Sequence, residues 1–460
     1  MKLEYLHSVY FLGIGGIGMS ALARWFHANG FVVTGYDKTS TELTEKLVEE
    51  GMAIHFEDNV NLIPEKVKKE RAGALIIYTP AVPKDLGLYQ YFVQEGFELY
   101  KRSQVLGMLT ESKYTIAVAG THGKTTTSSM VAHLLRSAGV DCSAFVGGIM
   151  TNYDSNLLIG ENNEVMVVEA DEFDRSFLTL HPDVAIITAT DADHLDIYGS
   201  KDALKDSFNA FIKNIKANGQ LFVEEKVAGE LELNPNGNIN VKTYGLKGGE
   251  VTIGELKIAD AKFAFDYQSA QRNTAGFALA MPGYHNVSNA IAAIASVSDL
   301  ITNDQALVDG LNTYKGVKRR FEYIIQSDDL VFIDDYAHHP EEIKALIESV
   351  RALYPTKKIT VIFQPHLFTR TRDFVDGFAE SLSMADEVLL LDIYPARELP
   401  IEGVTSEMIK EKMTIAEIKN YVKDDVLTYF DNHTPEVLIT VGAGNIDTLV
   451  SPIKRLLEKR

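Results

Sequence analysis

The chain has 460 residues, too many for one ordinary hydrophobic core, and a typical domain length of about 150 residues suggests about three domains. Its hydrophobic fraction of 46% and charged fraction of 23% are typical of a globular enzyme. The formal net charge of −20 argues against binding to nucleic acid or to an anionic membrane surface.

Cysteine content and hydropathy indicate the compartment. Cys142 is the only cysteine, so no disulfide can form within the chain. No stretch approaches about 20 uninterrupted apolar residues, and the N-terminus lacks a basic segment followed by an apolar one. We therefore expect a cytoplasmic protein without a membrane segment.

The N-terminal region has the pattern of a strand–helix–strand unit. A β-type run at residues 9–14 leads into the segment GIGGIG, a helix is predicted at residues 19–28, and a second strand at residues 31–35 closes on Asp37. Such glycines let a pyrophosphate approach a helix N-terminus, in a dinucleotide or in a nucleotide sugar. The predicted site consists of Gly13, Gly15, Gly16, Ile17, Gly18 and Asp37.

Three further residues could belong to this N-terminal site. Thr79 follows a predicted strand at residues 73–78, and the carboxyl ends of parallel strands are where such sheets bind ligands. His55 and Arg102 could contact a phosphate or a sugar, although an ordinary surface role fits each of the three equally well.

A phosphate loop is predicted at the start of the second domain. An apolar β-type run at residues 114–119 ends in the sequence GTHGKTT, and a helix follows. Val118 stands where the full Walker pattern has glycine, so the loop is a shortened variant. Its backbone N–H groups and lysine would face an anion, and a threonine hydroxyl can hold Mg²⁺. The predicted ATP-binding residues are Gly120, Thr121, His122, Gly123, Lys124, Thr125 and Thr126.

Acidic residues follow two predicted strands of the same domain. Residues 165–168 end on Glu169, and residues 184–187 are followed by Asp191, Asp193 and His194. A carboxylate at the end of a buried strand beside a phosphate loop is the usual partner of nucleotide-bound Mg²⁺. His194 could be a metal ligand or a capping residue, and the sequence leaves both open.

Little chemistry is predicted for the rest of the second domain. Residues 219–280 have the pattern of a strand meander. His285, Asn286 and Asn289 then open an alanine-rich helix, where their side chains can cap the helix or reach a nucleotide.

A third α/β region begins with a basic segment at residues 318–322, which is either a solvated hinge or a group that neutralises a transferring phosphoryl. Predicted strands at residues 330–333 and 359–363 are each followed by histidines, and arginines also follow the second; arginine suits capture of a carboxylate. Further strands are predicted at residues 387–393 and 437–441.

The predicted fold class is α/β with three domains. We expect an N-terminal Rossmann-like parallel sheet at residues 1–106, a central P-loop ATPase-type sheet with flanking β-structure at 107–315, and a C-terminal Rossmann-like sheet at 316–460.

Over essentially its whole length the chain resembles the Mur ligases of peptidoglycan synthesis. The motifs that carry the resemblance, in chain order, are GIGGIGM at 13–19, the loop at 120–126, EADE at 169–172, DHLD at 193–196, YHN at 284–286, RFE at 320–322, DDYAHHP at 334–340 and QPH at 364–366. The glycine-rich N-terminus favours the family member that adds alanine over those that add later residues.

The resemblance implies that the three domains bind UDP-N-acetylmuramate, ATP and L-alanine, respectively. ATP would phosphorylate the lactyl carboxylate, and the amine of alanine would attack the acyl phosphate. Lys124 would neutralise the β- and γ-phosphates, Thr125 and Glu169 would hold one Mg²⁺, and Glu169 and His194 a second.

The resemblance also implies contacts to substrate. These residues are His285 and Asn286 for nucleotide or substrate, Arg320 for the transferred phosphate, and Tyr336, His338, His366 and Arg370 for substrate and alanine. His338 is a candidate base for the amine. Residues 207–210 lack the lysine that carries a carbamyl group in many relatives, so the second ion would depend on Glu169, His194 and water.

Other functions explain less of the sequence. A dehydrogenase would account only for the first strand–helix–strand unit, and a regulatory ATPase would leave the histidines and arginines of the third region without a role. The nearest alternative is a sister ligase that attaches a preformed murein tripeptide to the same nucleotide sugar. The expected assembly is a monomer or weak homodimer.

Overall fold

The computed structural model describes residues 5–161, 164–191, 198, 200–235, 237–259, 262–281, 283–396, 398–415 and 417–459. The chain forms two compact units, the first from Met1–Gly254, Asp266–Ala275 and Ser288–Thr313, and the second from Glu255–Phe265, Gly276–Val287 and Tyr314–Arg460. The first unit contains the N-terminal sheet and most of the central sheet, and the second contains the C-terminal sheet.

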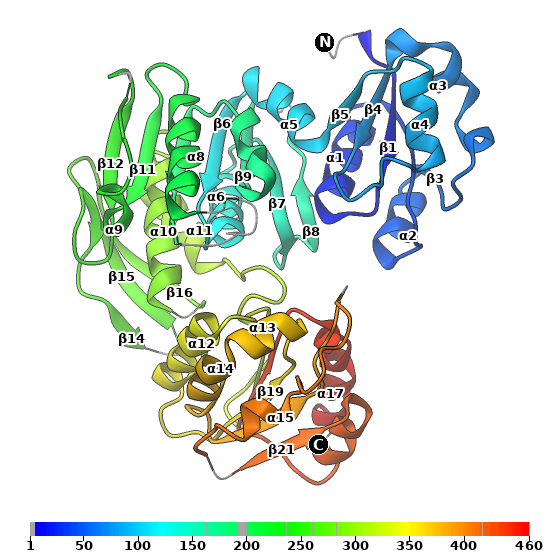
Figure 1. Ribbon diagram of the computed structural model, residues 1–460. Helices are drawn as coiled ribbons and strands as arrows, with labels where there is room; N and C mark the ends of the chain where they lie inside the picture. Colours follow the sequence, from blue (N-terminus) through cyan, green and yellow to red (C-terminus); the bar gives the residue numbers. More distant parts are fainter. Residues whose placement is uncertain are drawn as a thin grey trace. The chain divides into compact units, whose positions relative to one another are not determined.

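The N-terminal sheet is parallel and has the strand order β3-β2-β1-β4-β5 (Figure 1). Its strands are β1 (Ser8–Leu12), β2 (Val32–Tyr36), β3 (Ala53–His55), β4 (Ala74–Tyr78) and β5 (Leu99–Lys101). Its helices are α1 (Ile17–Ala28), α2 (Glu42–Glu49), α3 (Glu65–Lys69), α4 (Gly87–Gln94) and α5 (Arg102–Glu111).

Both faces of this sheet are buried. Successive side chains of β1 point to opposite sides, and every residue of the strand is buried. Phe11 packs against Phe26 of α1, with ring centroids 6.4 Å apart, and Tyr10 packs against Phe92 of α4 at 5.1 Å. Figure 1 accordingly shows α1 on one side of β1, and α3 and α4 on the other. The Rossmann-like prediction for this sheet is confirmed.

The central sheet has eleven described strands in the order β14-β15-β13-β12-β11-β10-β6-β9-β7-β8, with β16 paired to β15. Its strands are β6 (Tyr114–Ala119), β7 (Cys142–Met150), β8 (Ser155–Leu158), β9 (Val165–Ala170), β10 (Val184–Ile187), β11 (Gln220–Glu224), β12 (Asn240–Tyr244), β13 (Val251–Ile253), β14 (Lys257–Ala259), β15 (Lys262–Ser269) and β16 (Asn273–Leu279). Its helical segments are α6 (Lys124–Ser137), the 3₁₀ helix η4 (Phe173–Thr179), α8 (Lys201–Lys213), α9 (Glu225–Ala228), α10 (Tyr284–Val297) and α11 (Asp304–Asn312).

Strand β6 lies between β9 and β10, in parallel with both, so the loops that follow these three strands share one edge of the sheet. The expectation of a meander at residues 219–280 was wrong for its first half. Strands β11 and β12 extend the sheet in parallel, with α9 between them in the chain, while the pairings of β15 with β13 and β14 are antiparallel. Cys142 begins β7 and is fully buried, and burial raises the pKa of its thiol to about 12.

The C-terminal sheet has the strand order β17-β18-β22-β19-β20-β21, in which only β17 is antiparallel to its neighbour. Its strands are β17 (Glu322–Gln326), β18 (Val331–Asp335), β19 (Ile359–Phe363), β20 (Glu387–Leu391), β21 (Ile418–Tyr421) and β22 (Val437–Val441). Its helices are α12 (Pro340–Leu353), α13 (Phe368–Asp373), α14 (Val375–Leu382), α15 (Glu407–Lys410), α16 (Val426–Phe430) and α17 (Val450–Leu457).

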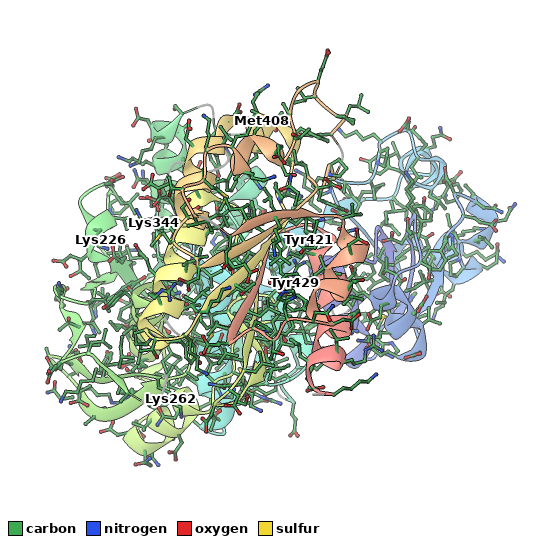
Figure 2. The ribbon with its side chains drawn as sticks, turned by 90° about the horizontal axis from the view of Figure 1, so that it is seen from below. Lys226, Lys262, Lys344, Met408, Tyr421 and Tyr429 are labelled. Atoms are coloured by element: carbon green, nitrogen blue, oxygen red, sulfur yellow. The ribbon has the colours of Figure 1, made fainter. Side chains whose placement is uncertain are left out.

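Both faces of the C-terminal sheet are buried, since nearly every consecutive residue of β18, β19, β20 and β22 is buried. Phe332 and Leu438 belong to a buried cluster with residues of α16 and α17. Tyr429 belongs to the same cluster, and Tyr421 packs against it with the two ring centroids 5.5 Å apart; both residues are labelled in Figure 2. Among the described residues, no helix is both long and apolar enough to cross a membrane.

Candidate functional site

The predicted phosphate loop has the backbone of an anion cradle. Gly120 and Gly123 have φ values of +134° and +81°, which residues with a side chain rarely adopt. Neighbours also exclude a side chain at both positions: a Cβ at Gly120 would collide with Thr188 Oγ1, and one at Gly123 would lie 2.8 Å from Asn289 Oδ1. Helix α6 begins directly after Gly123, so its free N–H groups and its dipole face the loop.

Lys124, the lysine of this loop, is held by a carboxylate that the sequence did not single out as its partner. Its Nζ donates to Gly120 O at 2.7 Å and lies 2.8 Å from Glu172 Oε2. The Glu172 side chain has no exposed surface, and its burial raises its pKa despite the opposing influence of Lys124. The structure thus pairs the lysine of the loop with a buried acid and with the carbonyl of Gly120.

Thr125 and Glu169 meet beside Lys124. Thr125 Oγ1 donates to Glu169 Oε1 at 2.9 Å, and the backbone N–H of Gly147 donates to Glu169 Oε2 at 2.7 Å. A Cβ at Gly147 would lie 2.5 Å from Glu169 Oε2, so only glycine lets β7 approach the carboxylate this closely. A hydroxyl and a carboxylate oxygen are ligands that suit Mg²⁺, so these residues fit the predicted ion.

Several other predicted residues of this region are placed less completely. His194, Asp193 and the rest of residues 192–197 lie outside the described residues. Thr121 accepts a hydrogen bond from Asp191 N at 3.1 Å, which ties the loop to the segment after β10. His285 and Asn286 lie in the first turn of α10, whereas Asn289, one turn later, is the residue that packs against Gly123. Asn289 was noted in the sequence but was not assigned to the site.

The glycine turn after β1 contacts Asp37 and Thr79, which were predicted to belong to the same site. Gly15 N donates to Asp37 Oδ2 at 2.6 Å, and a Cβ at Gly13 (φ +84°) would lie 2.6 Å from Thr79 Cγ2. Helix α1 begins directly after Gly16 and has no side-chain cap, which leaves its N-terminal amides for a ligand. Gly18 packs against Arg102.

His55 has a structural role. Its Nε2 lies 2.7 Å from the hydroxyl of the buried Tyr10, and its Nδ1 lies 2.9 Å from Glu57 O. Burial lowers the pKa of His55, so the imidazole is neutral and joins β3 to β1.

In the second unit, the residues predicted to place substrate and alanine form one cluster. The ring centroids of His338 and Tyr336 are 5.3 Å apart, those of His338 and His366 are 6.2 Å apart, and Arg370 Nη1 lies 3.4 Å from His366 Nδ1. Strand β22 lies between β18 and β19 in the sheet. The loops that follow β18 and β19 nevertheless contact each other, through His338 and His366.

The electrostatics of this cluster favour neutral imidazoles. Burial and the charge of Arg370 lower the pKa of His366 to about 4. Burial is also the largest influence that lowers the pKa of His338, and the charges of Arg370 and Arg320 add to it. A neutral histidine beside two arginines can accept a proton from an amine while the arginines attract anionic groups.

The comparisons with known proteins cover the whole chain. Three family descriptions match: "Mur ligase family, catalytic domain" at residues 8–114, "Mur ligase middle domain" at 118–297 and "Mur ligase, glutamate ligase domain" at 319–439. A protein of Flavobacterium johnsoniae named UDP-N-acetylmuramate–L-alanine ligase is 48% identical over 100% of both chains. One of the same name from Porphyromonas gingivalis is 46% identical over 98% of this chain and 99% of its own.

Solved structures agree with these relatives. The UDP-N-acetylmuramate-alanine ligase of Thermotoga maritima has a TM-score of 0.80 and 29% identity over 98% of this chain and 100% of its own. A murein peptide ligase of Psychrobacter arcticus has a TM-score of 0.64 and 21% identity over 99% of both chains, which shows a common fold. From these matches, the chain belongs to the Mur ligase family.

Proposed function

We propose that this protein is an ATP-dependent ligase that joins L-alanine to the lactyl carboxylate of UDP-N-acetylmuramate. The observation that carries the proposal is the match over the full chain, at 48% identity, to a relative named for this reaction. The murein peptide ligase of Psychrobacter arcticus is only 21% identical, so attachment of a preformed tripeptide is the less favoured alternative.

The reaction we propose has two steps. A carboxylate oxygen of the nucleotide sugar takes the γ-phosphoryl group of ATP, and ADP leaves. The amine nitrogen of L-alanine, after losing a proton, attacks the acyl carbon; the C–O bond to phosphate breaks, and an amide and inorganic phosphate result. Positioning and charge neutralisation account for most catalysis of such transfers, so the protein needs fixed cations more than a covalent nucleophile.

In the first unit, we assign nucleotide binding to the loop that ends in Lys124. Its amides and its lysine would neutralise the β- and γ-phosphates, for which Lys124 would exchange part of its contact with Glu172. Thr125 and Glu169 would hold Mg²⁺, whose positive charge would help to neutralise the nucleotide phosphates. We propose a second ion held by Glu169 and His194. The glycine turn with Asp37 and Thr79 would bind the UDP part of the sugar nucleotide.

In the second unit, we assign substrate contacts to the cluster around His338. Arg320 would neutralise the transferred phosphoryl group, and Arg370 would bind the carboxylate of alanine. His338 would take the proton of the attacking amine, because its lowered pKa keeps it neutral near pH 7. Tyr336 and His366 would shape the pocket for the amino acid.

One assay tests this function against its alternative. Phosphate release from ATP is measured with UDP-N-acetylmuramate and either L-alanine, a murein tripeptide or no acceptor. We expect rapid release only with L-alanine. Faster release with the tripeptide would establish the sister reaction instead, and no release with either acceptor would reject the ligase assignment.

We further propose that the protein works in the cytoplasm as a monomer or weak homodimer. The single cysteine fits a reducing compartment. Light scattering coupled to gel filtration would give the mass in solution, and a stable assembly larger than two chains would contradict the proposal.

A further inference from the structure

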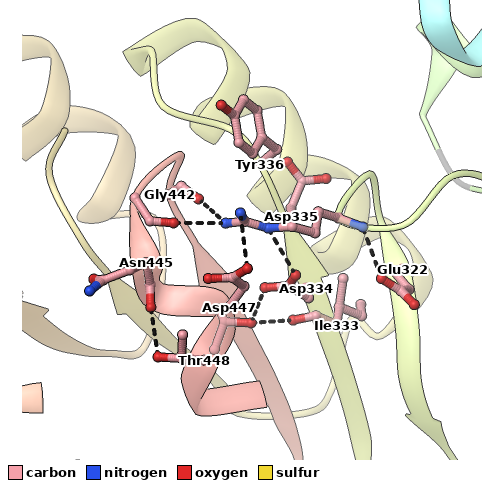
Figure 3. Close-up of polar contacts among 12 residues, drawn as sticks. Glu322, Ile333, Asp334, Asp335, Tyr336, Gly442, Asn445, Asp447 and Thr448 are labelled. Carbon is pink, nitrogen blue, oxygen red and sulfur yellow. Dashed lines mark hydrogen bonds and ion pairs between the residues drawn. The ribbon is translucent and has the colours of Figure 1, made fainter. Parts of the chain in front are cut away.

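Arg319, the residue before the proposed phosphate-binding Arg320, contacts two acidic residues and a backbone carbonyl. Figure 3 shows the partners that make these contacts, Asp334, Asp447 and Gly442. Its Nη2 donates to Gly442 O at 2.6 Å, its Nε lies 3.5 Å from Asp334 Oδ2, and its Nη1 lies 3.6 Å from Asp447 Oδ2. Only 22% of the Arg319 side chain and 2% of the Asp334 side chain are exposed. One guanidinium therefore joins the end of β18 to the segment that follows β22.

The backbone on both sides of Arg320 is held in an unusual conformation. Arg319 and Phe321 have φ values of +60° and +50°, in the left-handed region that residues with a side chain seldom adopt. Hydrogen bonds hold both: Arg319 N donates to Glu322 Oε2 at 2.9 Å, and Phe321 N donates to Asp335 Oδ2 at 2.6 Å. The segment at residues 318–322 is thus a built turn rather than a solvated hinge, and it fixes the direction in which Arg320 leaves the backbone.

Arg319 also supports the neighbouring substrate cluster. Its guanidinium carbon lies 5.0 Å from the centroid of the Tyr336 ring, and its carbonyl oxygen accepts a hydrogen bond from Tyr336 N at 2.6 Å. Tyr336 O in turn lies 2.9 Å from His338 Nδ1. Arg319 thus adjoins Arg320 in the chain and contacts Tyr336 through both its side chain and its backbone. Tyr336 in turn contacts His338.

We propose that Arg319 is a positioning residue for both the phosphoryl-transfer and the amino-acid parts of the site: it fixes the turn that presents Arg320, and its guanidinium lies against the ring of Tyr336. This proposal rests on the proposed function. Lysine cannot replace it, because a single ammonium group cannot reach two carboxylates and the Gly442 carbonyl while lying over an aromatic ring.

The test compares the same substitution at two arginines of the second unit, Arg319 in the turn before β17 and Arg351 in α12. Arg319→Lys is set against Arg351→Lys, because Arg351 also bridges a carbonyl and a carboxylate, with Nη1 to Lys357 O at 3.0 Å and Nη2 to Asp386 Oδ2 at 2.7 Å. Lys357 and Asp386 precede β19 and β20, so Arg351 lies at the amino end of the strands, opposite to the cluster.

For Arg319→Lys, we expect the KM for L-alanine to rise at least about tenfold, with the KM values for ATP and UDP-N-acetylmuramate within about twofold of wild type. Arg351→Lys should leave all three KM values unchanged. A purely structural role would lower kcat alone, in proportion to the folded fraction measured by circular dichroism, and that result would overturn the proposal.

A milder variant covers the case in which Arg319→Lys does not fold. Asp447→Asn removes the negative charge of the more exposed partner of Arg319 and should raise the KM for L-alanine about threefold; an unchanged KM would overturn the proposal. Failure of the proposed function is visible separately, because the wild-type protein itself would then show no alanine-dependent phosphate release, and the role of Arg319 would fall with it.

Discussion

The ammonium nitrogen of Lys124 lies 2.8 Å from a carboxylate oxygen of Glu172, a side chain with no exposed surface. Removal of the lysine would leave a buried carboxylate without this cation, and such losses destabilise proteins by about 3 kcal/mol. We therefore expect Lys124→Ala to fold, to lose alanine-dependent phosphate release, and to have a free energy of unfolding lower by about this amount, measured by urea denaturation.

The double variant Lys124→Met, Glu172→Gln serves as the control. It removes both charges together and should regain most of the lost stability without regaining activity. If Lys124→Ala alone is as stable as the wild type, the ion pair contributes nothing to the fold.

A second prediction concerns Gly147 and the carboxylate of Glu169. Because a Cβ at Gly147 would lie 2.5 Å from Glu169 Oε2, Gly147→Ala should displace this carboxylate and raise the half-saturating Mg²⁺ concentration by about tenfold or more. Gly229→Ala is the matched control, since a Cβ at Gly229 meets nothing within 4 Å. Equal Mg²⁺ dependence of the two variants would argue against Glu169 as a metal ligand.

A third prediction separates close packing from backbone strain in the glycine turn. Gly13 and Gly30 have nearly equal φ values, +84° and +85°, but only at Gly13 would a Cβ meet a neighbour, Thr79. The left-handed backbone alone should cost alanine about 1 kcal/mol of stability at either position. By calorimetry without ATP, wild type and Gly30→Ala should bind UDP-N-acetylmuramate, and Gly13→Ala should not. Normal binding by Gly13→Ala would exclude this turn as the site.

A fourth prediction concerns His133 in the helix that follows the phosphate loop. Its Nδ1 lies 2.8 Å from Tyr153 Oη and its Nε2 lies 3.1 Å from Thr313 Oγ1, and burial lowers its pKa to about 4. The folded protein therefore binds this proton less readily than the unfolded chain, in which the pKa of histidine is about 6.5. The stabilising contribution is complete above about pH 6.5 and is lost as the pH falls towards 4.

The variant His133→Gln cannot titrate and should lack this loss. Between pH 7 and pH 4.5, urea denaturation should show the wild type losing about 2 kcal/mol more stability than the variant. Parallel losses in the two proteins would show that His133 is already accessible to protons in the folded state.

Local patterns in the sequence were sufficient to predict the strands that carry the site. Strands β6, β10, β19 and β22 have the predicted boundaries, because an apolar run that ends in glycine or in polar residues marks both the strand and its end. The glycine turn after β6 and the start of α6 at Lys124 followed from the same local signal, and the binding of phosphate there stays a prediction.

Contacts between distant segments could not be predicted in this way. Glu172 is 48 residues from Lys124, and their pairing depends on β6 and β9 being neighbours in the sheet. The position of β22 between β18 and β19 is likewise a property of the sheet, because the order of strands in the chain does not determine their order in space. The turn at Arg319 was not predicted, because glycine is the usual signal of a left-handed backbone and the two left-handed positions are Arg319 and Phe321.

The burial of Cys142 makes the natural protein inert to thiol-directed dyes, since its sulfur is both covered and held in the unreactive protonated form. A cysteine introduced at an exposed position such as Leu399 would then be the sole attachment point for a fluorophore. Two such positions, one in each compact unit, would give a distance reporter for following substrate binding in real time without first removing any native residue.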